Sequence, residues 1–393
     1  MTRPPATRDA SRRSVVDYLR VEAVGGAVLV LAAALALLCA NSPLREAYRS
    51  LVTTEVPLPG VRLDVAGWAS EGLLTLFFFV AGLEVKRELV VGELRERRRA
   101  ALPVLAAVAG MAGPAAVYLA VAGGTGGRGW AVPVATDIAF ALGVLSLAGS
   151  RYPASLRVLL LSLAVVDDLG AIVLIAVLFP HGTAVLPLLG AAGVLALDAL
   201  LQRLRVRTPF LYVPLAVGAW LLVHEGGLHA TVAGVALGLL TRVRPDAGEE
   251  HAPGERLERR LQPWSAGLVV PVFAFTAAGI SLTGESLSGT LSDRVAWAVF
   301  LGLLLGKLGG IAGGIALATR LGLAERPAGV RTYDTVALGM LGGVGFTVSL
   351  LLADLAFSGP REEHAKAAVL AASVLASLVA ALLLRLRRGD QSG

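Results

Sequence analysis

The chain has few cysteines and few charged residues, which disulfide-stabilised and soluble proteins respectively depend on. Its one cysteine, Cys39, excludes an intrachain disulfide. Only 16% of the 393 residues are charged, whereas 55% are hydrophobic and the mean hydropathy is strongly positive. Long polar connections are also missing, which leaves no room for a soluble domain. An ordinary soluble protein is therefore excluded.

Long apolar runs are abundant instead. Runs of about 20 residues, enough to cross a hydrocarbon core of about 30 Å, recur along the whole chain. They predict an all-α membrane protein with one transmembrane domain, residues 23–385, between tails at 1–22 and 386–393. About twelve spans are expected, near 23–40, 66–85, 100–122, 130–148, 157–179, 182–201, 210–223, 228–240, 264–282, 295–319, 333–357 and 365–384. An alternative makes the two short runs at 210–223 and 228–240 a single re-entrant pair.

Lys and Arg residues concentrate in alternate connections, as they do on the cytoplasmic side of membranes. Examples are "KRELVVGELRERRR" at 86–99, "QRLRVR" at 202–207 and the tail "RLRR" at 385–388. This bias predicts cytoplasmic N- and C-termini in the cell (inner) membrane. The net charge of +6 follows from the same topology and from contact with the lipid bilayer, so it requires no nucleic acid partner.

The longest outside connection, residues 41–65, contains "LVTTEVPLPGVRLDV". Two β-prone runs around Pro-Leu-Pro-Gly predict a small β-hairpin, with an irregular loop as the alternative. A two-stranded hairpin alone is only marginally stable in water. Pairing with a second copy would supply further strands, which predicts a homodimer.

Ionisable residues inside the apolar runs are few, and two of them are adjacent. Asp167 and Asp168 lie within "SLAVVDDLGAIVLIAVLF" and point about 100° apart on a helix, so one salt bridge cannot serve both. Two carboxylates at mid-membrane suit a hard cation, or a proton that competes for the same oxygens. Lys307, alone in an apolar run, requires an acidic partner. The other charges inside or near the ends of spans are Glu71, Glu84, Asp137, Asp198, Asp334 and Asp354.

Two of the expected helices contain helix-weakening residues. "WAVPVATDIAFALG" places Pro133 shortly before Thr136 and Asp137, and "ALGMLGGVGFTVS" clusters four glycines that include Gly345. These runs are the middle members of the trios formed by spans 3–5 and 10–12. Interrupted crossing helices in spans 4 and 11 predict a transporter with inverted-topology repeats.

Several long motifs, in order along nearly the whole chain, show what the sequence resembles. They are "LFFFVAGLEVKREL" at 76–89, "ATDIAFALG" at 135–143, "VVDDLGAI" at 165–172, "GLHATVAG" at 227–234, "LQPWSAGLVVPVFAFTAAGISL" at 261–282, "LGKLGG" at 305–310 and "LGGVGFTVSLLLADLAF" at 341–357. With these motifs the chain resembles the NhaA sodium/proton antiporters, a family with inverted repeats.

The resemblance implies roles for the buried charges. Asp167 and Asp168 would bind the proton and the metal ion, Na⁺ or Li⁺, with Thr136 lining the site. Asp137 would compensate the positive N-terminal ends of facing half-helices, and Lys307 their C-terminal ends, in pairing with Asp167. No cofactor is expected.

The resemblance also implies a pH-sensing and ion-entry region at Glu84, Glu88, Glu258 and His229, with accessory roles for Glu71 and Gly345. Alternatively, Glu88 only balances the neighbouring Lys86 and Arg87. Arg259 and Gln262 stand where the best-known family member has histidines, so the pH range of activity cannot be inherited.

The expected function is secondary transport rather than enzymatic catalysis. Cytoplasmic Na⁺ or Li⁺ would be exchanged for external H⁺ by alternating access, in an electrogenic and pH-regulated cycle that serves sodium and pH homeostasis. The proton carriers are either both aspartates or Asp168 with Lys307.

Two other functions agree less well with the sequence than antiport does. A sodium-coupled symporter would need a larger polar pocket, and no extra polar cluster marks one. An intramembrane aspartyl protease would need Tyr-Asp and Gly-x-Gly-Asp motifs. "TYDT" at 332–335 offers the first, but "VVDDLG" does not supply the second.

Overall fold

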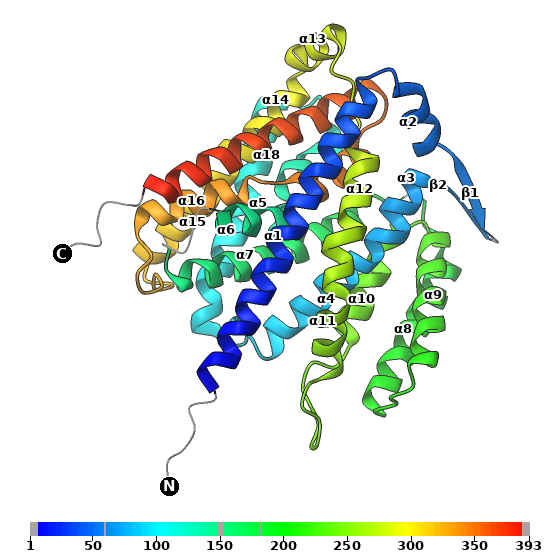
Figure 1. The fold of residues 1–393 in the computed structure, drawn as a ribbon, viewed down its shortest axis with the longest axis vertical. Coiled ribbons are helices and arrows are strands. Elements are labelled where there is room, and N and C mark those ends of the chain that lie inside the picture. Colours follow the sequence, from blue (N-terminus) through cyan, green and yellow to red (C-terminus); the bar gives the residue numbers. More distant parts are fainter. Residues whose placement is uncertain (1–6, 59, 148–151, 181, 387–393) are drawn as a thin grey trace.

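A computed structural model describes residues 7–58, 60–147, 152–180 and 182–386. Residues 1–6 and 387–393 of the predicted tails lie outside this part of the chain. Helices that pack side by side make up most of the molecule, and a small hairpin extends from one end (Figure 1).

The first long helix and the segments after it lead from one end of the molecule to the other and back. They are α1 (Thr7–Ala40), α2 (Arg45–Val52), β1 (Glu55–Leu58), β2 (Val61–Asp64), α3 (Val65–Gly67), the π-helical η1 (Trp68–Leu73) and α4 (Leu74–Val90). The predicted hairpin is confirmed, because β1 and β2 pair antiparallel with Val56 opposite Leu63. Gly60, in the turn between them, has a φ of +87°, a left-handed conformation that glycine adopts without strain.

The next segments include the helix that carries the predicted aspartate pair. It comprises η2 (Glu93–Arg95), α5 (Arg97–Ala122), the 3₁₀-helical η3 (Gly127–Val134), α6 (Ile138–Leu147), α7 (Ala154–Leu178), α8 (Val185–Arg203), α9 (Pro209–Glu225) and α10 (Thr231–Leu240). Figure 1 shows α8 and α9 as a pair at the edge of the molecule. The strongly apolar α7 is buried on the side that carries Asp167 and Asp168.

The remaining helices pack against these. They are α11 (Pro253–Trp264), the π-helical η4 (Ser265–Val269), α12 (Val270–Ala277), α13 (Gly284–Ser292), α14 (Arg294–Leu301), the π-helical η5 (Gly302–Gly306), α15 (Lys307–Arg320), α16 (Thr332–Gly342), α17 (Phe346–Ala356) and α18 (Pro360–Leu386). Helix α15 packs so closely on α5 that a Cβ atom at Gly314 would lie 2.6 Å from Ala109 Cβ. Small residues permit this close approach, as in many membrane helix pairs.

Both interrupted helices expected from the sequence are present. Residues 135–137 are non-helical and separate η3 from α6, and residues 343–345 separate α16 from α17, which meet at 45°. Pro133 lies in the 3₁₀ turn before the first break, and Gly343 and Gly345 lie in the second. Each break leaves backbone N–H and C=O groups without helical partners.

The helices agree with an all-α membrane protein. Within the described residues, seven helical segments are long and apolar enough to cross a membrane, and two bent pairs raise that number to nine. Helices α9 and α10 are shorter apolar helices, joined at residues 226–230. Each of the twelve predicted runs is helical over most of its described length, while the count of twelve crossings stays a prediction.

Candidate functional site

Asp137 lies in the first break, and its carboxylate accepts hydrogen bonds from the first turns of both α6 and α17. Its Oδ1 accepts a hydrogen bond from the Phe140 N–H (3.0 Å), in the first turn of α6. Its Oδ2 accepts bonds from the Thr347 N–H (3.2 Å) and hydroxyl (2.6 Å), in the first turn of α17. The Asp137 N–H in turn donates to Val344 O at 2.6 Å. One carboxylate thus satisfies free N–H groups at the positive ends of two helices.

Thr136 connects the second break to the aspartate pair. Its hydroxyl oxygen lies 2.6 Å from Asp167 Oδ2 and 2.9 Å from Gly342 O, the carbonyl at the end of α16. The single hydroxyl hydrogen can be donated to only one of these acceptors at a time. Thr136 therefore lies where the carboxylate and the free end of a half-helix meet.

Lys307 forms an ion pair with Asp167, and both side chains are fully buried. The π-helical turn η5 immediately precedes Lys307, and such turns change the direction in which the next side chains point. Gly342, the last residue of α16, lies beside the aliphatic part of the lysine. The lysine charge is thus close to a helix C-terminus, where a cation is stabilised.

Asp168 points away from this ion pair, as adjacent positions on a helix require. Its carboxylate accepts no hydrogen bond from any residue in the described ranges, although it is only 7% exposed. The Oδ1 atom of Asp167 is likewise buried without a hydrogen-bond partner. The acid pair therefore keeps free oxygen atoms in the interior of the molecule.

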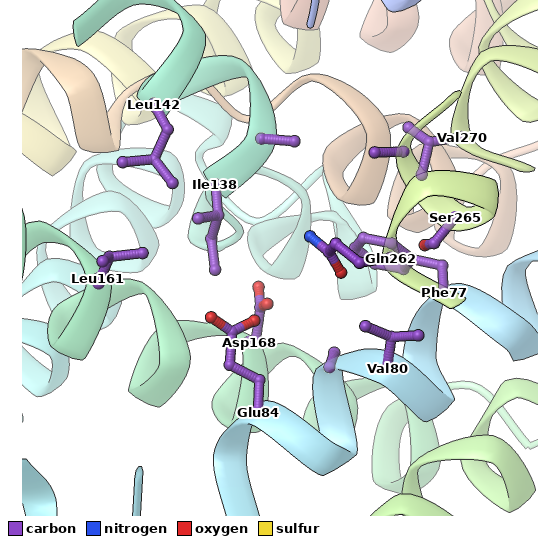
Figure 2. A pocket seen from close by; sticks show the side chains of 13 residues that line it. Phe77, Val80, Glu84, Ile138, Leu142, Leu161, Asp168, Gln262, Ser265 and Val270 are labelled. Carbon is purple, nitrogen blue, oxygen red and sulfur yellow. The ribbon is translucent and has the colours of Figure 1, made fainter. Parts of the chain in front are cut away.

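A pocket of about 50 Å³ opens beside Asp168. Figure 2 shows that Glu84, from α4, and Asp168, from α7, point toward one another, with the Gln262 side chain directed at the same space. Most of the other lining residues are apolar, such as Ile138 and Leu142. This volume can hold water or a small ion with part of its hydration shell.

Two of the expected pH-sensing residues, Glu88 in α4 and Glu258 in α11, do not line this pocket. Arg87 donates a hydrogen bond of 2.6 Å to Glu258, whose carboxyl is nearly buried. Burial raises the pKa of the Glu258 carboxyl, and Arg87 acts against that rise. Glu88 accepts a bond from the Glu93 N–H at 3.2 Å and lies 3.9 Å from Arg87. Glu88 thus contacts Arg87, one of the two basic residues that the alternative has it balance, and it also accepts a bond in the turn after α4.

Three further residues singled out in the sequence also lie outside the pocket. His229 is buried and pairs with the Thr231 hydroxyl at 2.7 Å, at the start of α10. Glu71 lies in η1 and contacts His224 of α9 at 2.7 Å. Gly345 precedes α17, where a Cβ atom would clash with Ser349 Oγ.

Sequence reasoning missed Thr347 and Ser265. Thr347 holds Asp137, and its place just after the glycine break, in "GGVGFT", was the available signal for a residue at a helix start. Ser265 lines the pocket from η4, and no pattern in the sequence indicated the π-helical turn that carries it. Gln262 was noted only as a departure from the family, not as a lining residue.

The described residues contain no group of three or more His, Cys, Asp or Glu side chains arranged to hold a metal ion. A small alkali cation beside Asp167 and Asp168 would therefore draw on hydroxyl, carbonyl and water oxygens as well, all of which are suitable ligands for hard cations.

Buried charges that meet at two broken helices place this helical membrane protein in the class of membrane ion transporters. Comparison with known proteins agrees. A family model described as Na⁺/H⁺ antiporter 1 matches residues 16–384, and the chain belongs to this family. The predicted resemblance is thereby confirmed.

Its relatives include proteins of similar length. The Na⁺/H⁺ antiporter NhaA 1 of Saccharopolyspora erythraea is 58% identical over 98% of this chain and 95% of its own length. The Na⁺/H⁺ antiporter NhaA of Nocardia farcinica is 56% identical over 96% of this chain and 92% of its own length. The similarity therefore extends over essentially the whole molecule.

Proposed function

We propose that the protein exchanges cytoplasmic Na⁺ or Li⁺ for external H⁺ at Asp167 and Asp168. The observation that carries this proposal is the difference between the two carboxylates. Asp167 is paired with Lys307, whereas Asp168 has no hydrogen-bond partner among the described residues and faces a pocket. A buried carboxylate in that position requires a cation or a proton.

Competition for the same oxygen atoms couples the two ions. A cation bound by Asp168 and Asp167 occupies oxygens that a proton would otherwise occupy, so entry of one favours release of the other. Thr136 and the carbonyl of Gly342 supply neutral oxygens nearby. Reorientation of the half-helices around Asp137 would expose this site alternately to the two sides of the membrane.

The cycle is proposed to be electrogenic, with more protons entering than sodium ions leaving. Two sets of proton carriers are compatible with the geometry. Both aspartates can carry protons, or Asp168 can act with Lys307, whose ion pair with Asp167 would open when sodium binds. Such exchange would export sodium at the expense of the proton gradient, in the service of sodium and pH homeostasis.

The protein is proposed to function as one transmembrane domain, residues 23–385, in the cell (inner) membrane, with both termini cytoplasmic. Orientation is argued from the basic connections. A homodimer is argued from β1, whose four residues are all exposed along an unpaired strand edge. Regulation by pH is assigned to Glu84, Glu88, Glu258 and His229.

The function is tested by Asp168→Asn, which keeps the side-chain shape but cannot titrate. Sodium-driven proton movement in proteoliposomes, measured across pH, should be abolished while the protein still inserts and folds. Asp198→Asn is the matched control, because Asp198 is also a buried carboxylate but lies in α8, outside the site. Full exchange by the Asp168→Asn protein would contradict the proposal.

A further inference from the structure

Helix α17 begins at the second break, and its neighbour α18 contacts it at both ends. At the beginning of α17, the Phe346 N–H donates a hydrogen bond of 3.2 Å to the Ser373 hydroxyl of α18. Near the end of α17, Asp354 forms an ion pair with Lys366 of α18. The side chains of Ser373, Asp354 and Lys366 do not line the pocket beside Asp168. They form a separate set of contacts, which the ion-exchange site does not use.

The spacing of these contacts matches along the two helices, which run antiparallel. Phe346 and Asp354 are eight residues apart in α17, and Lys366 and Ser373 are seven residues apart in α18. At a rise of about 1.5 Å per residue, these spacings correspond to about 12 Å and about 10.5 Å. About two turns therefore separate the contacts in each helix, which places both contacts on the face that each helix turns toward the other.

Both α18 residues are polar although they lie in the interior of the molecule. Ser373 is fully buried, and Lys366 is 9% exposed. Burying a charged lysine is costly unless the lysine is paired. The chain has only three lysines, Lys86, Lys307 and Lys366, and the last two are both buried and paired with an aspartate. A side chain that is costly to bury and that pairs with a half-helix indicates a role in holding that half-helix.

The beginning of α17 carries the residue that holds the first break. Thr347, the second residue of α17, donates two hydrogen bonds to Asp137. Thr136 precedes Asp137 and contacts Asp167. A backbone N–H in the first turn of a helix has no partner within that helix, so the Ser373 hydroxyl supplies one and fixes where α17 begins. The positions of Asp137 and Thr136 therefore depend on contacts made by α18.

We propose that Ser373, Lys366 and Asp354 are positioning residues for cation binding, because they hold α17 on α18 and so fix the oxygen atoms at the two breaks. This inference rests on the proposed function, in which Thr136 and the Gly342 carbonyl supply oxygens to the cation. Lys366 also places a positive charge near the C-terminal end of α17, where a cation is stabilised. Loss of either contact leaves the ion-binding groups in place chemically but allows α17 to shift. The expected result is weaker sodium binding rather than loss of the transport cycle.

The first test compares Ser373→Ala with Ser377→Ala. Ser373→Ala removes the acceptor of the Phe346 N–H, whereas the Ser377 hydroxyl donates within α18, to Ser373 O at 2.6 Å. Sodium-driven proton movement in proteoliposomes, measured over a range of sodium concentrations, gives the apparent KM for sodium and the maximal rate per folded protein. In Ser373→Ala the KM should rise about fivefold, while the maximal rate stays within about twofold of the wild type. Ser377→Ala should match the wild type in both, and Ser373→Thr, which keeps the hydroxyl, should restore the KM.

The second test removes the contact at the other end of α17. Asp354→Ala deletes the carboxylate on α17 and leaves Lys366 paired with Glu362 of its own helix at 2.8 Å, so the buried lysine keeps a partner. The KM for sodium should rise about twofold to threefold, less than in Ser373→Ala, because Asp354 lies farther from the break. Glu362→Gln is the control, since it removes the partner within α18 and keeps the contact with α17. Its KM should equal that of the wild type.

A merely structural role for these contacts would lower thermal stability and the amount of folded protein without changing the KM. An unchanged KM in the folded Ser373→Ala and Asp354→Ala proteins would therefore overturn the positioning role alone. If only one of these variants folds, that variant decides the question. Failure of both to fold would also overturn the positioning role, because the contacts would then serve folding. A wild-type protein without sodium-driven proton movement would instead overturn the proposed function.

Discussion

Two clusters of charges in this molecule differ in how deeply they are buried and in how many oppositely charged partners each charge has. At the broken helices, Asp167 and Lys307 form a fully buried pair. In the loop between α10 and α11, Glu249 faces several arginines, with Arg242 at 2.9 Å, Arg207 at 3.3 Å and Arg256 at 3.9 Å. Each of these buried charges has one oppositely charged partner and no access to bulk water. The loop cluster has redundant partners, two of them more than half exposed.

The difference shows where a charge can be lost without harm. Removing one member of a buried pair leaves the other charge without compensation, and no water can replace the missing partner. Removing one arginine from the loop cluster leaves Glu249 with the other arginines, whose side chains are in part exposed to solvent. Sensitivity to substitution should therefore fall steeply from the broken helices to the loop, and the following variants test that order.

The largest effect is expected for Lys307→Ala. It leaves Asp167 buried without its ion-pair partner, which should lower stability by about 3–5 kcal/mol and reduce or abolish exchange. Thermal unfolding of the purified protein, followed by tryptophan fluorescence, measures the loss. The double variant Asp167→Asn with Lys307→Gln removes both charges and should recover much of the stability without exchange. A Lys307→Ala protein as stable and active as the wild type would remove the pairing argument.

Lys307→Arg separates a structural lysine from a proton carrier. Arginine keeps the positive charge but does not release a proton in the physiological range. If the lysine carries a proton, the variant should still exchange ions but lose electrogenic coupling. If the lysine is structural, the variant should keep both. Membrane-potential and proton signals recorded on the same vesicles distinguish these results.

An intermediate effect is expected for Thr347→Val. It removes the 2.6 Å hydrogen bond from the hydroxyl to Asp137, while the bond from the Thr347 N–H remains. The lost bond to a buried carboxylate should cost about 1–3 kcal/mol in thermal unfolding. Thr347→Ser keeps the hydroxyl and should behave like the wild type. Equal stability of the valine and serine variants would show that the hydroxyl does not hold Asp137.

The smallest effect is expected in the loop cluster, and it depends on pH. The hydrogen bond from Arg242 is the main cause that lowers the pKa of Glu249 to about 2 from its usual 4.5. The resulting stabilisation is fully present above about pH 4.5 and is lost as pH falls toward 2.

The Arg242→Gln variant loses the hydrogen bond to Glu249 and with it part of the stabilisation of the folded state. The unfolding temperature at pH 7 should therefore fall by about 2 °C or less. The decline on acidification should also become shallower. Arg256→Gln removes the most distant of the three arginines and should change the pH dependence least. A steeper acid decline in the Arg242→Gln protein would contradict the assignment of the pKa shift to this arginine.

Much of the architecture could be predicted, because it depends on local features of the sequence. Apolar runs located the helices, Pro133 and the glycines around Gly345 located the breaks, and the strand-turn-strand pattern at 51–65 located the hairpin. The boundaries were less accurate. Helix α1 begins at Thr7, well before the predicted span at 23–40. The prediction followed the apolar run, whereas the helix continues into the polar segment before it.

By itself the sequence determined the class of protein, the breaks, the presence of the acid pair and the family. Only the tertiary structure decided which partners these groups have. Thr347 meets Asp137 across 210 residues, and Lys307 meets Asp167 across 140. It also decided that Asp168 shares a pocket with Glu84, Gln262 and Ser265. Hydropathy and helix-breaking residues act over one or two turns of chain, whereas the partner of a buried charge depends on how distant helices pack.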